Sequence, residues 1–396
     1  MFDAATAQLL RSAPGVPGLN PQEIPALLTK HFANLVSMRL MGAIDNSPGV
    51  GEVWSLERIA DTYELIASLQ TDGGLRRASA FVAGIAQQIL ARRQSSAVTD
   101  DNLRPNIDRD HIDPTIAATV LFLAAEQYAD ANEAASVVRP PRQDGQQIYE
   151  ATILSEDIVD LARGQMQRIL DRAERWRRPR RDRDLEERAL AALLETLISG
   201  VEILAARFLA VPIPVSSSGR FDTARDAFKR VLELSAVVAT EANTLDLGGN
   251  VLKAFPGPHH LASLLIAAYD GVSQAALTAL PPPDGADPDF WRQWLRFRAN
   301  SFPFVWPNHR EAIEKEFHET GKSAVVVLPT GAGKTTVSSL KIAGVLARGK
   351  KVIFLAPTHA LVEQLTVDLQ EMFPKDILGA VVSNEFDVLF QSGAQL

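Results

Sequence analysis

The chain has 396 residues, of which 46% are apolar and 22% charged, and it contains no cysteine. This composition excludes a collagen-like, disulfide-dense or wholly disordered protein, and the length allows roughly two or three domains with cores of their own. The net charge of −8 excludes nucleic-acid binding driven by overall charge, so any such binding requires a local basic surface.

The absence of cysteine excludes disulfides and thiolate metal sites, and it fits a reducing, cytoplasmic location. The first residues carry an early acid, Asp3, and lack the basic start and long apolar run of a secretory signal. The most apolar long window, Leu197–Val215, is interrupted by Glu202 and Arg207. This window predicts a buried helix rather than a membrane span, so we expect no membrane partner.

Residues 25–280 place apolar side chains at three- and four-residue spacing, which is typical of amphipathic helices. No fixed-period repeat occurs, so a solenoid is not supported. Ser155 with Asp157, and Asp222 or Thr223, are plausible helix starts. The predicted helices are Ala26–Met41, Leu56–Leu69, Ala78–Leu90, Ile116–Tyr128, Ile153–Ile169, Leu185–Leu209, Phe228–Val238 and Leu261–Ala279. We therefore predict a helical accessory domain over residues 1–280.

A proline-rich linker is predicted over residues 281–289, because three consecutive prolines end a helix and hold the chain extended. After the linker, short apolar runs alternate with helical stretches. The expected strands are Ala324–Leu328, Lys351–Ala356 and Ile377–Val382, and the expected helices are Thr336–Arg348 and Ala360–Met372. This alternation predicts βαβ units and a parallel sheet.

The strongest motif is a phosphate-binding loop, Leu328-Pro-Thr-Gly-Ala-Gly-Lys-Thr335, between the first expected strand and the next helix. Its glycines let the backbone bend around a phosphate, and the amides of the following helix can then point at the anion. Lys334 would reach the outer phosphates of ATP, and the Thr335 hydroxyl would hold Mg²⁺. The predicted nucleotide-binding residues are Pro329, Thr330, Gly331, Ala332, Gly333, Lys334, Thr335 and Thr336, with Lys334 and Thr335 also assigned to catalysis.

This loop resembles motif I of the superfamily 2 DEAD/DEAH-box helicases, which tolerate a residue other than glycine at the first position. Ala356-Pro-Thr-His-Ala-Leu-Val-Glu-Gln364 is similar to the same family's motif Ia, usually Pro-Thr-Arg-x-Leu-x-x-Gln. The resemblance implies that Pro357, Thr358 and His359 contact a nucleic-acid backbone, although His359 stands where arginine is usual. The alternative is an ordinary loop with a helix cap at Thr358.

A third segment, Phe304–Ile313, is similar to the family's adenine-side segment, often Arg-Pro-x-Gln-Arg-Glu-Ala-Ile. The resemblance places His309 where a glutamine reads the adenine edge, and Trp306 or Phe304 could stack on the base. The alternative is that the aromatic residues of this region dock the helical part onto the sheet domain. They are Trp291, Trp294, Phe297, Phe302 and Trp306.

Together these segments imply an incomplete RecA-like ATP-binding domain over residues 290–396, so the predicted fold is α plus α/β. A helicase of this family also needs a DExx acidic pair and a second RecA-like domain that supplies arginines. Neither is recognisable in the 61 residues after Thr335, and Asn384–Asp387 is expected to be a loop. We therefore expect a truncated domain and a chain that hydrolyses ATP poorly by itself.

A basic segment lies inside the helical region, where residues 163–183 carry nine arginines and three acids. Arg175, Arg177 and Arg178 could bind nucleic-acid phosphates, and Trp176 could stack on a base. The alternative is a solvated run that pairs with the following acids, Asp184 to Glu187. The acids and histidine between Asp108 and Asp113 are more typical of a cap and turn than of a metal site.

These observations predict the N-terminal portion of an ATP-dependent helicase or translocase that uses ATP and Mg²⁺ and acts on DNA or RNA. By analogy, other subunits of a repair or genome-defence system are further expected partners. Two alternatives stay open. The first is a nucleotide- and nucleic-acid-binding module that does not hydrolyse ATP, and the second is another phosphate-loop enzyme such as a kinase.

Overall fold

The structure is a computed structural model. It describes residues 2–41, 54–97, 106–139, 149–175, 183–215, 217–238, 251–319, 321, 323–328, 333–355 and 357–373. The chain divides into two compact units. Unit 1 comprises residues 1–207 and 211–274, and unit 2 comprises residues 208–210 and 275–396.

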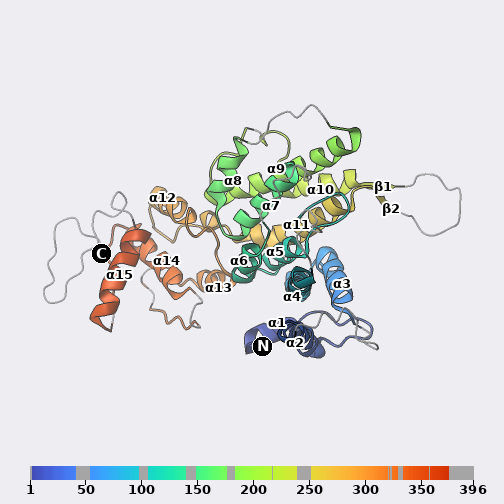
Figure 1. The fold of residues 1–396 in the computed structure, drawn as a ribbon. Coiled ribbons are helices and arrows are strands. Elements are labelled where there is room, and N and C mark those ends of the chain that lie inside the picture. The colour runs from blue at the N-terminus through green and yellow to red at the C-terminus, as the bar shows by residue number, and fades with distance from the viewer. Residues whose placement is uncertain are drawn as a thin grey trace. The chain divides into compact units, whose positions relative to one another are not determined.

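Unit 1 is helical (Figure 1). Its α-helices are α1 (Ala4–Arg11), α2 (Ile24–Met41), α3 (Leu56–Leu69), α4 (Gly73–Ala97), α5 (Pro114–Ala124), α6 (Tyr128–Ser136), α7 (Tyr149–Ala162), α8 (Met166–Ala173), α9 (Leu185–Leu209), α10 (Ala224–Ser235) and α11 (Pro256–Gln274). A 3₁₀ helix, η1 (Pro21–Glu23), precedes α2. The strands β1 (Ala236–Val238) and β2 (Val251–Lys253) pair antiparallel. Helix α4 packs against α3 and α5, and α11 packs against α5 and α10.

Several helix starts follow directly from local chemistry. Asp113 caps α5 by accepting a hydrogen bond from the Thr115 amide at 2.8 Å, and Pro114 occupies the first helical position, where no amide donor is needed. Thr223 and Asp226 form a reciprocal capping box at α10, which confirms the start predicted there. The start predicted at Ser155 is wrong, because Ser155 lies inside α7 and its hydroxyl donates to the Ala151 carbonyl at 2.8 Å.

The predicted bounds of α3 and α9 match the structure, since both segments keep one apolar face over their whole length. The single helix expected over residues 153–169 is two helices, α7 and α8. The break falls at Gly164, whose φ of +72° leaves the right-handed helical region. Helix α10 ends at Ser235, because the next residues, expected to be helical, pair with β2.

The core of unit 1 is built from α5, α9 and their neighbours. Helix α5 is buried from Thr115 to Ala124. Helix α9 is long and apolar enough to cross a membrane by length and composition alone, but 78% of its most apolar window is buried inside the folded chain. Leu194, Leu197 and Ile198 are fully buried. This burial is what a core helix requires, as the sequence predicts for this part of the chain.

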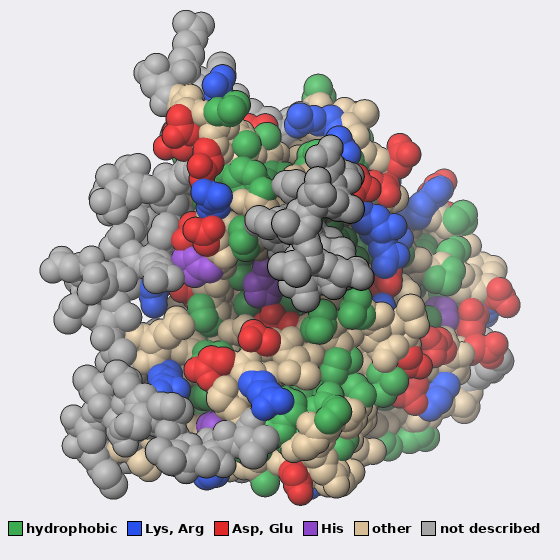
Figure 2. Space-filling model, turned by 90° about the vertical axis from the view of Figure 1, so that its right-hand side faces the viewer, with side chains coloured by type: hydrophobic (Ala, Val, Ile, Leu, Met, Phe, Trp, Pro, Cys, Tyr) green, Lys and Arg blue, Asp and Glu red, His purple; other side chains and the backbone are tan. Residues whose placement is uncertain are grey.

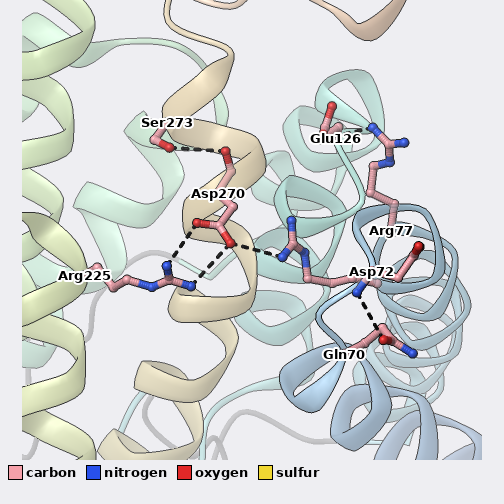
Figure 3. Close-up of polar contacts among 8 residues, drawn as sticks. Gln70, Asp72, Arg77, Glu126, Arg225, Asp270 and Ser273 are labelled. Carbon is pink, nitrogen blue, oxygen red and sulfur yellow. Dashed lines mark hydrogen bonds and ion pairs between the residues drawn. The ribbon is translucent and has the colours of Figure 1, made fainter.

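A group of ion pairs joins three helices of unit 1 (Figure 3). Asp270 of α11 accepts from Arg76 of α4 at 3.1 Å and pairs with Arg225 of α10 at 3.3 Å. Beside it, Arg77 of α4 pairs with Glu126 at 3.3 Å. A Cβ at Gly271 would lie 2.9 Å from the Glu126 carboxyl oxygen, so a larger residue there would force the Glu126 side chain to shift.

The described part of unit 2 contains the 3₁₀ helix η3 (Leu277–Ala279) and four α-helices. They are α12 (Pro288–Ala299), α13 (Pro307–Glu314), α14 (Lys334–Leu346) and α15 (His359–Met372). Its core joins α12, α14 and α15, with Trp294 stacked on Phe373 at 5.5 Å between ring centroids. The indole nitrogens of Trp291 and Trp294 donate to the Leu280 and Met372 carbonyls, both at 3.1 Å. The tryptophans therefore fix α12 against the chain on both sides.

The predicted RecA-like parallel sheet is wrong for the residues that the structure describes. Residues 323–328 and 351–355 contain no strand, and β1 with β2 is the only sheet within the described ranges. Val325, Val327, Ile353 and Leu355 are 79–90% exposed. A short apolar run becomes a strand only where its amides and carbonyls pair with another segment, and no local pattern supplies that partner. The third expected strand, 377–382, lies outside the described residues.

Candidate nucleotide and nucleic-acid sites

The start of α14 has the backbone of an anion site. Gly333 is the N-cap residue with φ +78°, and it offers no side chain to the first helical amides. The first internal helix bond runs from the Val337 amide to the Gly333 carbonyl at 3.1 Å, so the amides of Lys334, Thr335 and Thr336 have no acceptor within the helix. Such an end, with its partial positive charge, binds phosphates or carboxylates.

The predicted functional side chains at this helix end point to the same chemistry. Lys334 and Thr335 are exposed, and they follow Gly333 directly. An ammonium and a hydroxyl next to free amides fit the phosphates and Mg²⁺ of a nucleotide. Four predicted contacts, Pro329, Thr330, Gly331 and Ala332, lie outside the described residues.

His309 lies against Gly333. The side chain is 2% exposed, and a Cβ at position 333 would lie 2.3 Å from its Nε2. Its ring stacks parallel to Trp306, with ring centroids 5.6 Å apart and an interplanar angle of 5°. Glycine is thus required at 333 both by the positive φ and by the closeness of the imidazole. The structure brings His309 to the phosphate-loop end of α14, whereas the resemblance placed it at the adenine.

The other aromatic residues of the region divide between core and surface. Phe304, expected as a second stacking ring, instead meets Phe208 edge-on at 5.1 Å. Trp291 and Trp294 are core residues of unit 2. Phe297 and Phe302 are exposed by 37% and 54%, and neither is required by that core.

The motif Ia segment forms a helix start. Thr358 is the N-cap of α15, and its hydroxyl accepts from the Leu361 amide at 3.4 Å. Pro357 and Thr358 are exposed, and His359 is the first helical residue. The cap alternative therefore describes what the Thr358 hydroxyl does in this structure, and the amides at the helix start are what can face a phosphate.

Two residues of the arginine-rich segment, Arg172 and Arg183, form ion pairs with carboxylates of α7. Arg172 pairs with Asp157 and Asp160 through its two terminal nitrogens, and with Glu156 at 3.0 Å through Nε. Arg183 forms a two-pronged pair with Glu150, at 3.1 and 2.8 Å. The expected pairing with the acids after the segment is therefore wrong for these two arginines. Their partners come from α7, which the sequence did not indicate.

This network is buried on the carboxylate side. The Asp157 side chain is 1% exposed and that of Asp160 6% exposed. Burial raises the pKa of Asp157, and the adjacent Arg172 opposes that rise. Of the three arginines assigned to nucleic acid, Arg175 is exposed and its Nε donates to the Asp171 carbonyl at 2.8 Å. Arg177 and Arg178 lie outside the described residues.

The acidic segment before α5 is a turn, as predicted. Asp108 accepts from the amides of Asp110 and His111, both at 2.8 Å, and Asp113 caps α5. Within the described ranges, no group of three or more His, Cys, Asp or Glu side chains is placed to hold a metal. Glu385 and Asp387, the acids nearest the end of the chain, lie outside those ranges.

The surface charge gives no broad binding field on the face drawn in Figure 2. Basic and acidic side chains are interleaved there over the described residues, which agrees with the net charge of −8. On that face, a polyanion would need a small, locally built contact.

A comparison with known families matches one part of the chain. Residues 308–389 match the family described as "Type III restriction enzyme, res subunit", which is related to the superfamily 2 helicases. The match begins at α13, next to His309, and includes the phosphate-loop and motif Ia segments. It suggests a helicase-related ATPase and an association with nucleic acid, and it covers none of unit 1.

Proposed function

We propose that unit 2 binds ATP with Mg²⁺ at the start of α14 and couples that binding to DNA or RNA, as the nucleotide-binding part of a helicase or translocase. The observation that carries this proposal is the Gly333-Lys334-Thr335 end of α14, where a positive-φ glycine precedes exposed Lys334 and Thr335. The family match over residues 308–389 supports the same reading. A cytoplasmic setting and further subunits of a restriction-type genome-defence system belong to the same proposal.

Each proposed site residue has a role that follows from its chemistry. ATP·Mg²⁺ would supply an electrophilic phosphoryl group when bound. The α14 amides and Lys334 would hold its phosphates, and Thr335 would hold the metal ion. His309 would pack against Gly333 and leave no space for a side chain at that position. The start of α15, from Pro357 to His359, would face the nucleic-acid backbone.

Nucleotide binding to the full chain tests this proposal. The probe is a fluorescent ATP analogue titrated in the presence of Mg²⁺. Lys334→Ala removes the cation beside the phosphates, and we expect it to weaken binding at least tenfold, because charge-assisted bonds to phosphate are the strong ones. Lys350→Ala is the matched control, since Lys350 is an exposed lysine just after α14.

Equal affinities of the wild-type chain, Lys334→Ala and Lys350→Ala would contradict the phosphate-loop assignment. Phosphate release measured on the same samples separates two functions. Binding without nucleic-acid-stimulated release supports the non-hydrolysing module, and release that disappears in Lys334→Ala supports an ATPase within this chain.

A further inference from the structure

The C-terminal turn of α12 and the residues just after it carry two arginines and two exposed aromatic rings within seven residues. Arg296 and Phe297 are exposed, and Phe302 follows the helix with 54% of its surface open. Arg298 lies between them in the sequence and is only 6% exposed. This composition, basic and aromatic, is typical of surfaces that bind single-stranded nucleic acid.

Arg298 has an unusual environment for a buried cation. Its guanidinium lies over the Phe302 ring, 4.6 Å from the centroid. Burial lowers its pKa, and Glu371 opposes that shift from a distance. Among the residues that the structure describes, no carboxylate comes within ion-pair distance of Arg298 or Arg296, and no acceptor takes a hydrogen bond from their guanidinium groups.

Other arginines of the chain show how this position differs. Arg172, also largely buried, contacts three carboxylates. Arg292, one and a half turns before Arg298 on the same helix, pairs with Asp289. Most of the Arg298 side chain is buried, although none of its nitrogens is cut off from solvent. A largely buried guanidinium is stabilised by an anion or by acceptors for its five N–H donors, and the described part of unit 2 gives Arg298 neither.

The Phe302 ring contacts the Arg298 guanidinium and is itself partly open to solvent. One side of its ring carries the guanidinium, and more than half of the side chain is open to solvent. An aromatic ring on the surface provides area on which a base can stack, and an arginine fork matches the geometry of a phosphate. The Phe302 ring therefore suits the base of a nucleotide, and the Arg298 guanidinium suits its phosphate.

The position of the C-terminal end of α12 in unit 2 also fits single-stranded nucleic acid as the ligand. Trp294, one helical turn before Arg298, donates to the Met372 carbonyl at the C-terminal end of α15. The motif Ia residues lie at the other end of α15, which has 14 residues and hence spans about 20 Å. A strand that contacts the start of α15 therefore needs about that length to reach α12.

We propose that Arg296, Arg298 and Phe302 form a second contact for single-stranded nucleic acid, with phosphate at the guanidinium groups and a base stacked on Phe302. This inference rests on the proposed function, which brings nucleic acid to unit 2. The competing explanation is purely structural, because arginines in a last helical turn also stabilise the helix dipole.

Binding of a fluorescein-labelled 20-nucleotide oligothymidine to the full chain, followed by anisotropy, tests the contact. Phe302→Leu keeps an apolar side chain but removes the stacking face, and we expect a loss on the order of tenfold. Arg296→Gln and Arg298→Gln should each lower the slope of log affinity against log salt by about 0.7, because each removes one phosphate contact to a single strand. Arg292→Gln is the matched control and should change neither quantity.

Wild-type affinity and salt slope in both Phe302→Leu and Arg296→Gln would overturn the proposal. These two side chains are exposed, so the test does not depend on whether the buried Arg298 variant folds. Displacement of the oligonucleotide by a polyglutamate peptide at equal affinity would also overturn it, in favour of an acidic protein ligand.

Nucleotide binding by the same variants keeps the two proposals apart. If every α12 variant binds the ATP analogue and the oligonucleotide like the wild-type chain, only the α12 contact fails. If Lys334→Ala binds the ATP analogue normally while Phe302→Leu loses the oligonucleotide, the nucleotide site fails and the α12 contact stands.

Discussion

Apolar segments taken from each of the two units are buried to opposite extents. In unit 1, Leu197 and Ile198 of α9 are fully buried, whereas in unit 2 Val325 and Ile353 are 90% and 79% exposed. A helix pairs its own amides and carbonyls, so it needs neighbours only for its apolar face. An extended segment needs a partner for its backbone as well. The same kind of apolar run therefore becomes a core element in one unit and an exposed segment in the other.

The units also differ in how they hold a buried arginine. Arg172 of unit 1 is neutralised by three carboxylates of α7, whereas Arg298 of unit 2 lies on a phenylalanine ring without such partners in the described residues. The first arrangement is what a structural ion pair requires. The second leaves the guanidinium donors without a protein acceptor among the described residues. The first prediction below tests the Arg172 side of this comparison.

The largest expected effect is at Arg172. Arg172→Gln would leave Asp157 buried without its cation and Asp160 with only Arg168, 3.9 Å away, and we expect unit 1 to lose about 3–5 kcal/mol in its free energy of unfolding. Because the pKa of Asp157 is raised in the folded state, its protonated form is favoured there. The loss should therefore be greatest at neutral pH and shrink as the pH falls through that raised pKa.

Urea unfolding followed by circular dichroism at several pH values measures this effect. Arg175→Gln is the control, since Arg175 is exposed and, among the described residues, its side chain contacts a backbone carbonyl and no carboxylate. A loss at Arg172 no greater than that at Arg175, at neutral pH, would show that the network does not hold α8 on α7.

The next largest effect is expected from the difference in burial between Leu197 and Val325. Leu197→Ala opens a cavity in α9 and should cost about 2–5 kcal/mol. Val325→Ala changes an exposed side chain and should stay within about 0.5 kcal/mol. The same urea unfolding measures both. A comparable loss for Val325→Ala would mean that residues 323–328 are covered in solution.

A smaller effect is expected at the phosphate loop. Gly333→Ala places a Cβ at a positive φ, which costs roughly 1–2 kcal/mol, and against His309. His309→Ala in the same chain removes the second conflict but not the first, so the double variant should recover part of the loss. Unfolding is followed by tryptophan fluorescence in a chain with Trp54 and Trp176 of unit 1 replaced by phenylalanine, so that Trp291, Trp294 and Trp306 report on unit 2. Strictly additive losses would show that His309 does not press on the glycine.

The smallest expected effect is a pH dependence from His318. Burial lowers the pKa of this histidine, which is 7% exposed; Lys341 adds to the shift, and Glu319 and Glu316 oppose it. A lowered pKa means that the neutral ring is favoured in the fold. Unit 2 should therefore be most stable above pH 6.5 and lose that contribution as the pH falls through the lowered value. His318→Gln should flatten this dependence, measured by thermal unfolding, and an unchanged curve would contradict it.

Sequence patterns predicted much of the helical architecture. The bounds of α3 and α9 and the cap at Thr223 depend on contacts within a few residues, which a pattern contains. The break at Gly164 and the β1–β2 pair were missed. The first needs a positive φ that glycine permits but does not impose, and the second joins segments separated along the chain.

The candidate site divides in the same way. Gly333, Lys334 and Thr335 were predicted from their spacing, because a phosphate loop is a local motif. His309 was identified by resemblance, but its contact with Gly333 joins two helices and appears only in the structure. Arg296 and Arg298 drew no attention in the sequence, since arginines near a helix end are ordinary.

The sequence by itself determined many of the helical segments and where several helices begin, and it predicted which residues would hold a phosphate. Each of these depends on groups within one or two helical turns of each other. The tertiary structure decided which arginines are neutralised and which apolar runs are covered. Partners such as Asp157 for Arg172, and the missing strand partners of residues 323–328, depend on pairing between segments that no local pattern encodes.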